Sequence, residues 1–149
     1  MSEEQQAVFS IEKIYVKDMS LEIPHAPEVF LERETPQIDV QLRTDNSTVN
    51  EGVYQTVLTV TITAKVKEKT LFLVEVAQAG IFQIRNIPQE EMDPVLGITC
   101  PNILFPYVRE VLSDGIGRAG FPPVLLNPMN FEAYYQQQKQ AQAEVLVDN

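Results

Sequence analysis

The sequence predicts an α+β fold, a four-stranded antiparallel sheet with two C-terminal helices packed on one face. Two features of the chain predict it. Four segments between residues 9 and 84 have the apolar patterning of strands, and the last third of the chain changes to helical spacing. Short polar connections, such as KEK at residues 67–69, favour antiparallel pairing of neighbouring strands.

The first two predicted strands lie on either side of a proline-rich segment. Residues 9–23 place most apolar side chains at one parity, with bulges expected around Lys13 and Lys17. The apolar parity comprises Phe9, Ile11, Tyr15, Met19, Leu21 and Ile23. Residues 38–43 alternate apolar and polar side chains as a second strand does, and the prolines between residues 24 and 36 predict a bend or crossover.

The third and fourth predicted strands differ in the number of faces that they bury. Residues 54–66 alternate aliphatic side chains with threonines, which predicts one buried face and one polar face. Residues 71–84 are apolar at both parities, so both faces of this strand are expected to be covered. Because the chain has few elements left for two covering layers, we expect a second copy of the protein to supply one of them. The sequence therefore predicts self-association.

The first predicted helix follows these strands. It is expected to begin at Asn102, whose side chain can cap it, and to end at Gly115 or Gly117. Pro106 then falls near the first turn, where a missing N–H costs least. Residues 121–130 contain several prolines and predict an extended connector.

The second predicted helix closes the chain. Asn130 can cap a helix over residues 131–145, whose glutamine-rich end is expected to fray. One side of this helix carries Phe131, Tyr134, Tyr135 and Gln138. The whole chain, 1–149, is expected to form a single domain with a frayed N-terminus over about residues 1–7 and a C-terminal tail over about residues 140–149.

The composition predicts a cytoplasmic protein that binds neither nucleic acid nor the membrane interior. The formal net charge of -10 would repel phosphate backbones. No segment approaches the roughly 20 apolar residues of a membrane helix, and the N-terminus lacks the features of a secretory signal. Cys100 is the single cysteine, so no disulfide can form within the chain, which suits a reducing compartment.

Reaction chemistry has few candidate residues. The common nucleotide, hydrolase and zinc-protease motifs are absent. His25 lies in a proline-flanked turn, and Cys100 precedes the first helix, where its thiolate could be stabilised; an exposed turn residue and a buried small residue are the simpler interpretations. The carboxylates of residues 89–94 are interpreted as a solvated turn rather than a metal loop. The sequence thus predicts no enzyme, no cofactor and no metal site.

Several long segments carry a resemblance to a known family. IYVKDMSLEIPHAPEVF, EVAQAGIF, LGITCPNILFPYVRE, GFPPVLLNPMNFEA and YQQQ closely resemble the SecB family of protein-export chaperones, in the family's order and over nearly the whole chain. The resemblance implies a homotetramer, a dimer of dimers, whose subunits each carry a four-stranded sheet and two helices. It also implies an ATP-independent holding chaperone that binds unfolded precursor polypeptides in hydrophobic grooves and delivers them to the SecA motor.

The resemblance further assigns residues to three surfaces by matching motifs. The face that meets SecA is assigned to Asp18, Glu22, Leu73 and Glu75. Subunit association is assigned to Val74, Val76 and Gln78. The client-binding groove is assigned to Phe30, Pro36, Phe105, Tyr107, Phe131, Tyr134 and Tyr135, although any one of these aromatic side chains could instead fill the core.

The chain departs from the family pattern at two places. Glu34 stands where members often carry a tryptophan, so an aromatic contact in the groove is lost or moved. The C-terminal residues AQAEVLVDN do not match the usual tail that touches SecA. The alternative function is an acidic adaptor, which would dock on a basic partner through its sheet without holding unfolded chains.

Overall fold

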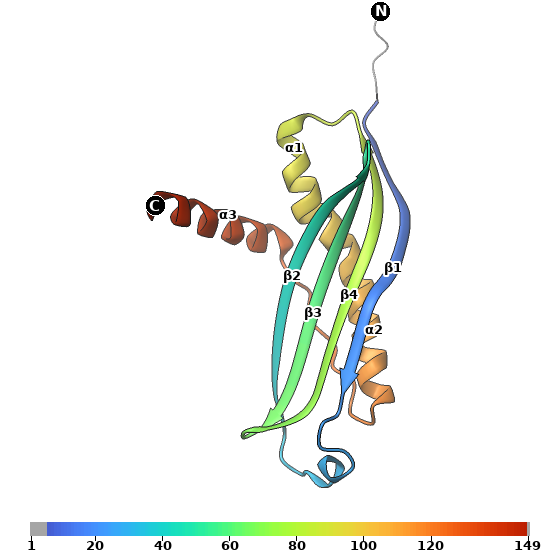
Figure 1. Cartoon of the computed structure of the whole chain (residues 1–149), viewed down its shortest axis with the longest axis vertical. Helices are drawn as coiled ribbons and strands as arrows, with labels where there is room; N and C mark the ends of the chain where they lie inside the picture. The colour runs from blue at the N-terminus through green and yellow to red at the C-terminus, as the bar shows by residue number, and fades with distance from the viewer. Residues whose placement is uncertain (1–5, 149) are drawn as a thin grey trace, which may run out of the picture.

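The chain forms one twisted antiparallel sheet, with a long helical run behind it and a last helix that projects to one side (Figure 1). The computed structural model describes residues 6–148. The four strands are β1 (Val8–Glu22), β2 (Gln37–Asn50), β3 (Val53–Val66) and β4 (Lys69–Arg85), in the order β1-β4-β3-β2. The helical elements are η1 (Glu28–Leu31), α1 (Gln89–Pro94), η2 (Val95–Thr99), α2 (Cys100–Arg118) and α3 (Phe131–Asp148). The predicted α+β class and the four-stranded antiparallel sheet are confirmed.

The sheet has two chemically different faces, because side chains alternate along each strand. The face that we call the helix face packs against α2 and forms the core. Its central side chains on β3 and β4 are completely buried: Leu58, Val60, Ile62, Val74, Val76 and Phe82. The opposite face, which we call the open face, has no helix over it and is turned toward the viewer in Figure 1. It carries Thr59, Thr61 and Thr63 of β3 and follows the predicted alternation there, whereas Thr56 lies on the helix face and is completely buried.

Two bulges interrupt the pairing of β1 with β4, between Ile11 and Lys13 and between Val16 and Asp18. The bulges lie where the sequence predicts them. Each one inserts an extra residue and so exchanges the faces of the residues that follow. Tyr15, predicted to share the apolar parity of Phe9 and Met19, lies on the open face instead, where its hydroxyl donates to Gln55.

The helical run begins earlier than predicted, at Gln89 rather than at Asn102, and passes through α1, η2 and α2 without a break. The carboxylates of residues 89–94 therefore belong to a helix and not to a turn. Pro106 lies inside α2 and not in a first turn. The run ends at Arg118, beyond both glycines proposed as its end, and Gly120 follows with a φ of +97°, a conformation in which glycine is unstrained.

A wide turn in the helical run is explained by Pro101. In a regular α-helix the carbonyl of Gly97 would accept a bond from residue 101, but proline has no N–H and its ring would clash with that carbonyl. The chain opens instead into a π-type turn over Val95–Thr99, in which the N–H of Cys100 donates to the carbonyl of Val95. This turn is the part of the run that faces α3.

The last helix begins as predicted but packs differently. The Oδ1 of Asn130 accepts a bond of 2.9 Å from the N–H of Ala133, which confirms the predicted cap. Among the α3 side chains that the structure describes, residues 131–143, Phe131 is the only buried one, Tyr134 and Tyr135 are half-buried, and the helix beyond them projects away from the sheet (Figure 1). The prediction that both helices pack on one face holds for α2 and is wrong for most of α3, because its polar sequence offers little apolar surface to bury.

The predicted frayed ends are only partly covered by the described residues. Residues 1–5 and 149 lie outside them, as do the side chains from position 144 onward. The backbone of α3 is helical as far as Asp148. Fraying of the tail, about residues 140–149, stays a prediction.

Candidate functional site

An uncovered apolar strip runs along β2 on the helix face. Ile38, Val40 and Leu42 pair with fully buried residues of β3, so they lie on the helix face, which α2 covers over β3 and β4. On the β2 side that cover ends, and Ile38 and Val40 remain 38% and 44% exposed. We call these three residues the β2 strip. Because β2 is an edge strand, the backbone N–H and C=O groups on its outer side have no neighbouring strand to pair with.

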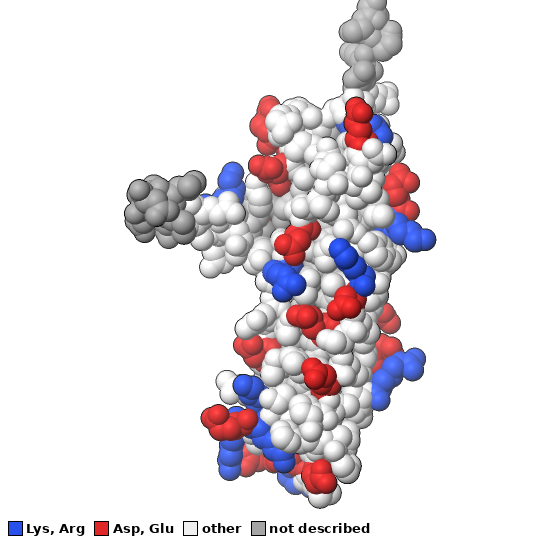
Figure 2. Space-filling view, in the orientation of Figure 1, with Lys and Arg blue, Asp and Glu red and all other residues white. Residues whose placement is uncertain are grey.

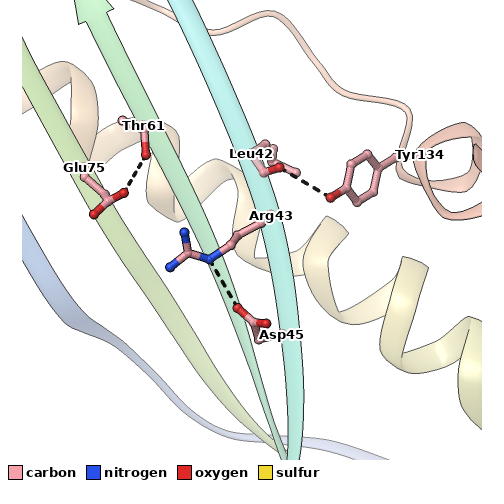
Figure 3. A network of polar contacts seen from close by, with 6 residues as sticks. All are labelled: Leu42, Arg43, Asp45, Thr61, Glu75 and Tyr134. Carbon is pink, nitrogen blue, oxygen red and sulfur yellow. Dashed lines mark hydrogen bonds and ion pairs between the residues drawn. The ribbon is translucent and has the colours of Figure 1, made fainter. Parts of the chain in front are cut away.

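A groove of about 400 Å³ lies between β2 and α3, at the Leu42 end of the β2 strip. The Tyr134 hydroxyl donates to the carbonyl of Leu42 at 3.4 Å and ties α3 to the strand (Figure 3). Partial burial, and secondarily the negative charge of Asp45, raise the pKa of Tyr134, so this hydroxyl stays protonated and able to donate. The ring of Tyr135 closes another part of the groove, next to Gly97.

Phe105 and Phe131 lie beneath this groove and do not line it. Both are buried, and their rings meet edge to face with centroids 5.8 Å apart. They fix the first turn of α3 against α2. Of the predicted groove residues near α3, Tyr134 and Tyr135 therefore line the groove, whereas these two phenylalanines belong to the core that supports it.

A second aromatic group lies at the other end of the β2 strip. Phe30, in the crossover between β1 and β2, is 44% exposed and stacks on Phe121 at 5.2 Å between centroids. Phe121 in turn contacts the buried Phe72 at 4.9 Å. Pro36 is half-buried where the chain enters β2. Tyr107 belongs to neither aromatic group, since it lies on the exposed outer side of α2.

The four residues assigned to the SecA face do lie together on the open face. Glu22 pairs directly with Leu73, Asp18 pairs with Ala77, and Glu75 lies between these two rungs of β4. The Oε1 of Glu75 accepts a 2.7 Å bond from the hydroxyl of Thr61 (Figure 3).

A shallow depression of about 610 Å³ adjoins this group on the open face. Asp18 and Glu75 line it, together with Lys17, Arg43 and Asp45. Acidic and basic side chains both occur over this side of the molecule, in several places next to one another (Figure 2). The depression offers charged groups of both signs to a protein partner.

The residues assigned to subunit association lie inside the subunit. Val74 and Val76 are 0% exposed between β4 and α2. Gln78 is 3% exposed, and its Nε2 donates to the carbonyl of Tyr15 at 3.2 Å, while its Oε1 has no donor within the described residues. None of the three presents a side chain to the surface, so any effect on association would have to act through the packing of β1 or α2.

Sequence reasoning missed a second uncovered apolar strip, on the β1 edge of the helix face. Its members are 39% to 48% exposed: Phe9, Ile11, Val16 and Met19. We call them the β1 strip. A detectable signal was present, because apolar residues recur along a strand that the sheet order places at an edge. The sequence does not reveal that order, so their exposure could not be predicted.

The described residues contain no arrangement suited to catalysis or metal binding. Cys100 is 0% exposed, and burial raises the pKa of its thiol to about 12, an effect that a side-chain hydrogen bond with Thr56 only partly offsets. His25 is exposed in the crossover. Between residues 6 and 148 no three His, Cys, Asp or Glu side chains are grouped as metal ligands would be. None of the helices in that range is both long and apolar enough for a membrane span.

Cys100 is expected to resist alkylation in the native protein. Only the thiolate reacts, and with a pKa of about 12 its population at pH 8 is about 1,000-fold lower than that of an ordinary cysteine. Iodoacetamide labelling followed by mass spectrometry should detect this slow reaction, with the urea-unfolded protein as the fully reactive control. Complete labelling of the folded protein at the unfolded rate would contradict the buried position.

Comparisons with known proteins agree over most of the chain. The family profile described as "Preprotein translocase subunit SecB" matches residues 2–142. A Protein-export protein SecB of Methylobacillus flagellatus is 64% identical over 143 residues, which cover 96% of this chain and 91% of the relative. One from Chromobacterium violaceum is 64% identical over 146 residues, covering 97% of each.

A solved structure shares the fold. A SecB-like chaperone of Mycobacterium tuberculosis, solved in complex with a peptide from an antitoxin, superposes with a TM-score of 0.67. The superposition covers 81% of this chain and 90% of that one, at 16% sequence identity. At that identity the likeness establishes the fold.

Proposed function

Because the chain belongs to the SecB family of protein-export chaperones, which are not enzymes, we propose that it holds unfolded secretory precursors without ATP. It then delivers them to the SecA motor in the cytoplasm. The observation that carries the proposal is the β2 strip, an apolar surface left uncovered beside an unpaired strand edge and leading into the groove at α3.

These features suit an extended, unfolded client. A client backbone can pair with the free edge of β2, while its apolar side chains cover Ile38 and Val40. Burying the exposed part of each such side chain contributes only about 1 kcal/mol. Apolar contact has no preferred direction, and many weak contacts along one chain add up through high effective concentration. Tight binding with little sequence preference follows, and no nucleotide is needed to maintain it.

The proposed SecA surface is separate from the client surface. Asp18, Glu22, Leu73 and Glu75 lie on the open face, whereas the β2 strip lies on the helix face. A subunit can therefore contact SecA while a client stays bound. This separation supports delivery without prior release of the client.

The proposed homotetramer, a dimer of dimers, would cover the β1 strip. β1 is the second edge of the sheet, and the four apolar side chains of the β1 strip are 39% to 48% exposed there. A second copy that pairs with this edge would satisfy its backbone and bury those side chains. The sequence expectation of a covering copy stays a prediction, and the uncovered apolar surface that the copy would bury flanks α2 rather than lying over β4.

The proposed function predicts that the purified protein slows the folding or aggregation of a slow-folding precursor in the absence of nucleotide. The measurement is the refolding rate of a denatured precursor at several-fold molar excess of the protein. An unchanged rate would refute holding. A protein that bound SecA but left that rate unchanged would be the acidic adaptor instead.

A further inference from the structure

We propose that Gly97 is a positioning residue for the client groove, because it provides the seat on which Tyr135 sets the direction of α3. The inference rests on the proposed function and assigns a specific role within it. A Cβ at position 97 would lie 2.5 Å from Cδ1 and 2.7 Å from Cε1 of Tyr135. Real carbon atoms do not approach so closely, so only glycine allows this ring to lie where it does.

The seat exists because the helical run is locally widened. Pro101 forces the π-type turn over Val95–Thr99, and Gly97 lies in the middle of that turn. A glycine inside a helix is normally unfavourable by about 1 kcal/mol relative to alanine. Here the space left by the missing side chain is filled by the ring of Tyr135, 38 positions further along the chain.

Among the described side chains of α3, three contacts made by its first five residues set the orientation of the helix. Phe131 packs on Phe105, the Tyr134 hydroxyl bonds to Leu42, and Tyr135 rests on Gly97. From residue 136 to 143 every side chain of α3 is exposed. No later contact among these residues can therefore correct the direction of the helix once the first turn shifts.

A small shift at Tyr135 is enlarged further along the helix. Gln142 lies seven residues beyond Tyr135, about 10 Å along the axis at the usual rise per residue. Gln138 and Gln142 line the groove opposite Thr44 and Asn46 of β2. The width of the groove, and so its affinity for a client, depends on the position of the Tyr135 ring over Gly97.

The chain provides a matched control on the same helical run. At Gly117 a Cβ would meet only Cγ of Pro123, at an ordinary 3.6 Å. Gly97→Ala and Gly117→Ala both exchange a helical glycine for alanine, but only Gly97→Ala displaces Tyr135. The two variants should therefore differ in the position of α3 and not in intrinsic helix propensity.

The test measures hydrogen exchange of α3 in the full-length protein without client, and then the affinity for a denatured precursor. Gly97→Ala should increase exchange of the peptide over residues 131–143 about tenfold and weaken client binding by a similar factor, whereas Gly117→Ala should change neither. Tyr135→Ala should reproduce both effects without adding atoms to the turn. Adding Gly97→Ala to Tyr135→Ala should have no further effect, because the clash has been removed.

Three results would overturn the proposal. These are equal exchange in Gly97→Ala and Gly117→Ala, protected α3 amides in Tyr135→Ala, or additive losses in the double variant. If Gly97→Ala fails to fold, the Tyr135→Ala result alone decides. Hydrogen exchange is measured without client, so it tests the role of Gly97 in positioning α3 independently of the proposed function. Failure of the wild-type protein to hold precursors would refute the proposed function instead.

Discussion

Replacing Val16 with lysine should dissociate the proposed homotetramer into smaller species. Val16 lies in the middle of the β1 strip and is 43% exposed in the isolated subunit. A lysine there would bring an unpaired charge into the proposed contact between copies, which costs about 3–5 kcal/mol. The dissociation constant of that contact should rise about 100-fold or more. Sedimentation velocity and native mass spectrometry at micromolar concentration measure the change.

A matched control lies on the same strand. Ser20→Lys adds the same charge, but Ser20 pairs with Glu75 on the open face and is exposed there. The native mass of the Ser20→Lys variant should equal that of the wild-type protein. A Val16→Lys variant that keeps the wild-type mass, or a Ser20→Lys variant that dissociates, would place the association surface elsewhere than on the β1 strip.

The strands were predictable because apolar and polar residues alternate along the strands according to the face that is buried. On β3 the aliphatic residues at alternate positions pack under α2, while Thr59, Thr61 and Thr63 carry the other parity. On β1 the same reasoning misplaced Tyr15. Two bulges exchange the faces along that strand, and each bulge depends on pairing with a distant partner. A single sequence shows where bulges are possible but not the exact residue at which each occurs.

The helix boundary could not be predicted, because prolines usually indicate breaks. Pro94, Pro101 and Pro106 all lie within one continuous helical run. The wide turn accommodates Pro101. Pro106 and Asn102 both lie on the exposed side, where water can bond to the carbonyl that Pro106 leaves without a partner. Pro106 is tolerated because of where it faces, and that orientation is a property of the folded chain.

Residue type identified the group of aromatic residues around the candidate site, but it did not show which of them line the groove. Phe105 and Phe131 are as apolar as Phe30, yet the first two are buried and Phe30 remains accessible. Phe105 and Phe131 are buried because they pack on each other where α3 meets α2, and that contact joins segments far apart in the sequence. The SecA face was easier to group, since alternation along two paired strands already puts its members on one side.

Because the proposed client and SecA surfaces lie on different faces of the sheet, one substitution should impair SecA binding alone. Glu75→Lys should weaken binding to SecA at least about tenfold while leaving client holding unchanged. Glu75 is half-buried on the open face among Asp18, Arg43 and Lys17, so a lysine reverses the charge at the centre of the proposed contact. It also removes the bond from Thr61, which should cost about 1 kcal/mol of folding stability.

Asp39→Lys is the matched control for Glu75→Lys. Asp39 lies on the same face but on the far edge strand, where it pairs with Thr63, outside the proposed contact. Both variants change the net charge by the same amount, so a local contact predicts that Asp39→Lys keeps most of its affinity for SecA. Equal losses in the two variants would mean that net charge, and not this surface, controls binding. Loss of client holding by Glu75→Lys would mean that client and motor share one surface, because the β2 strip lies on the opposite side of the sheet and is not altered by a substitution at position 75.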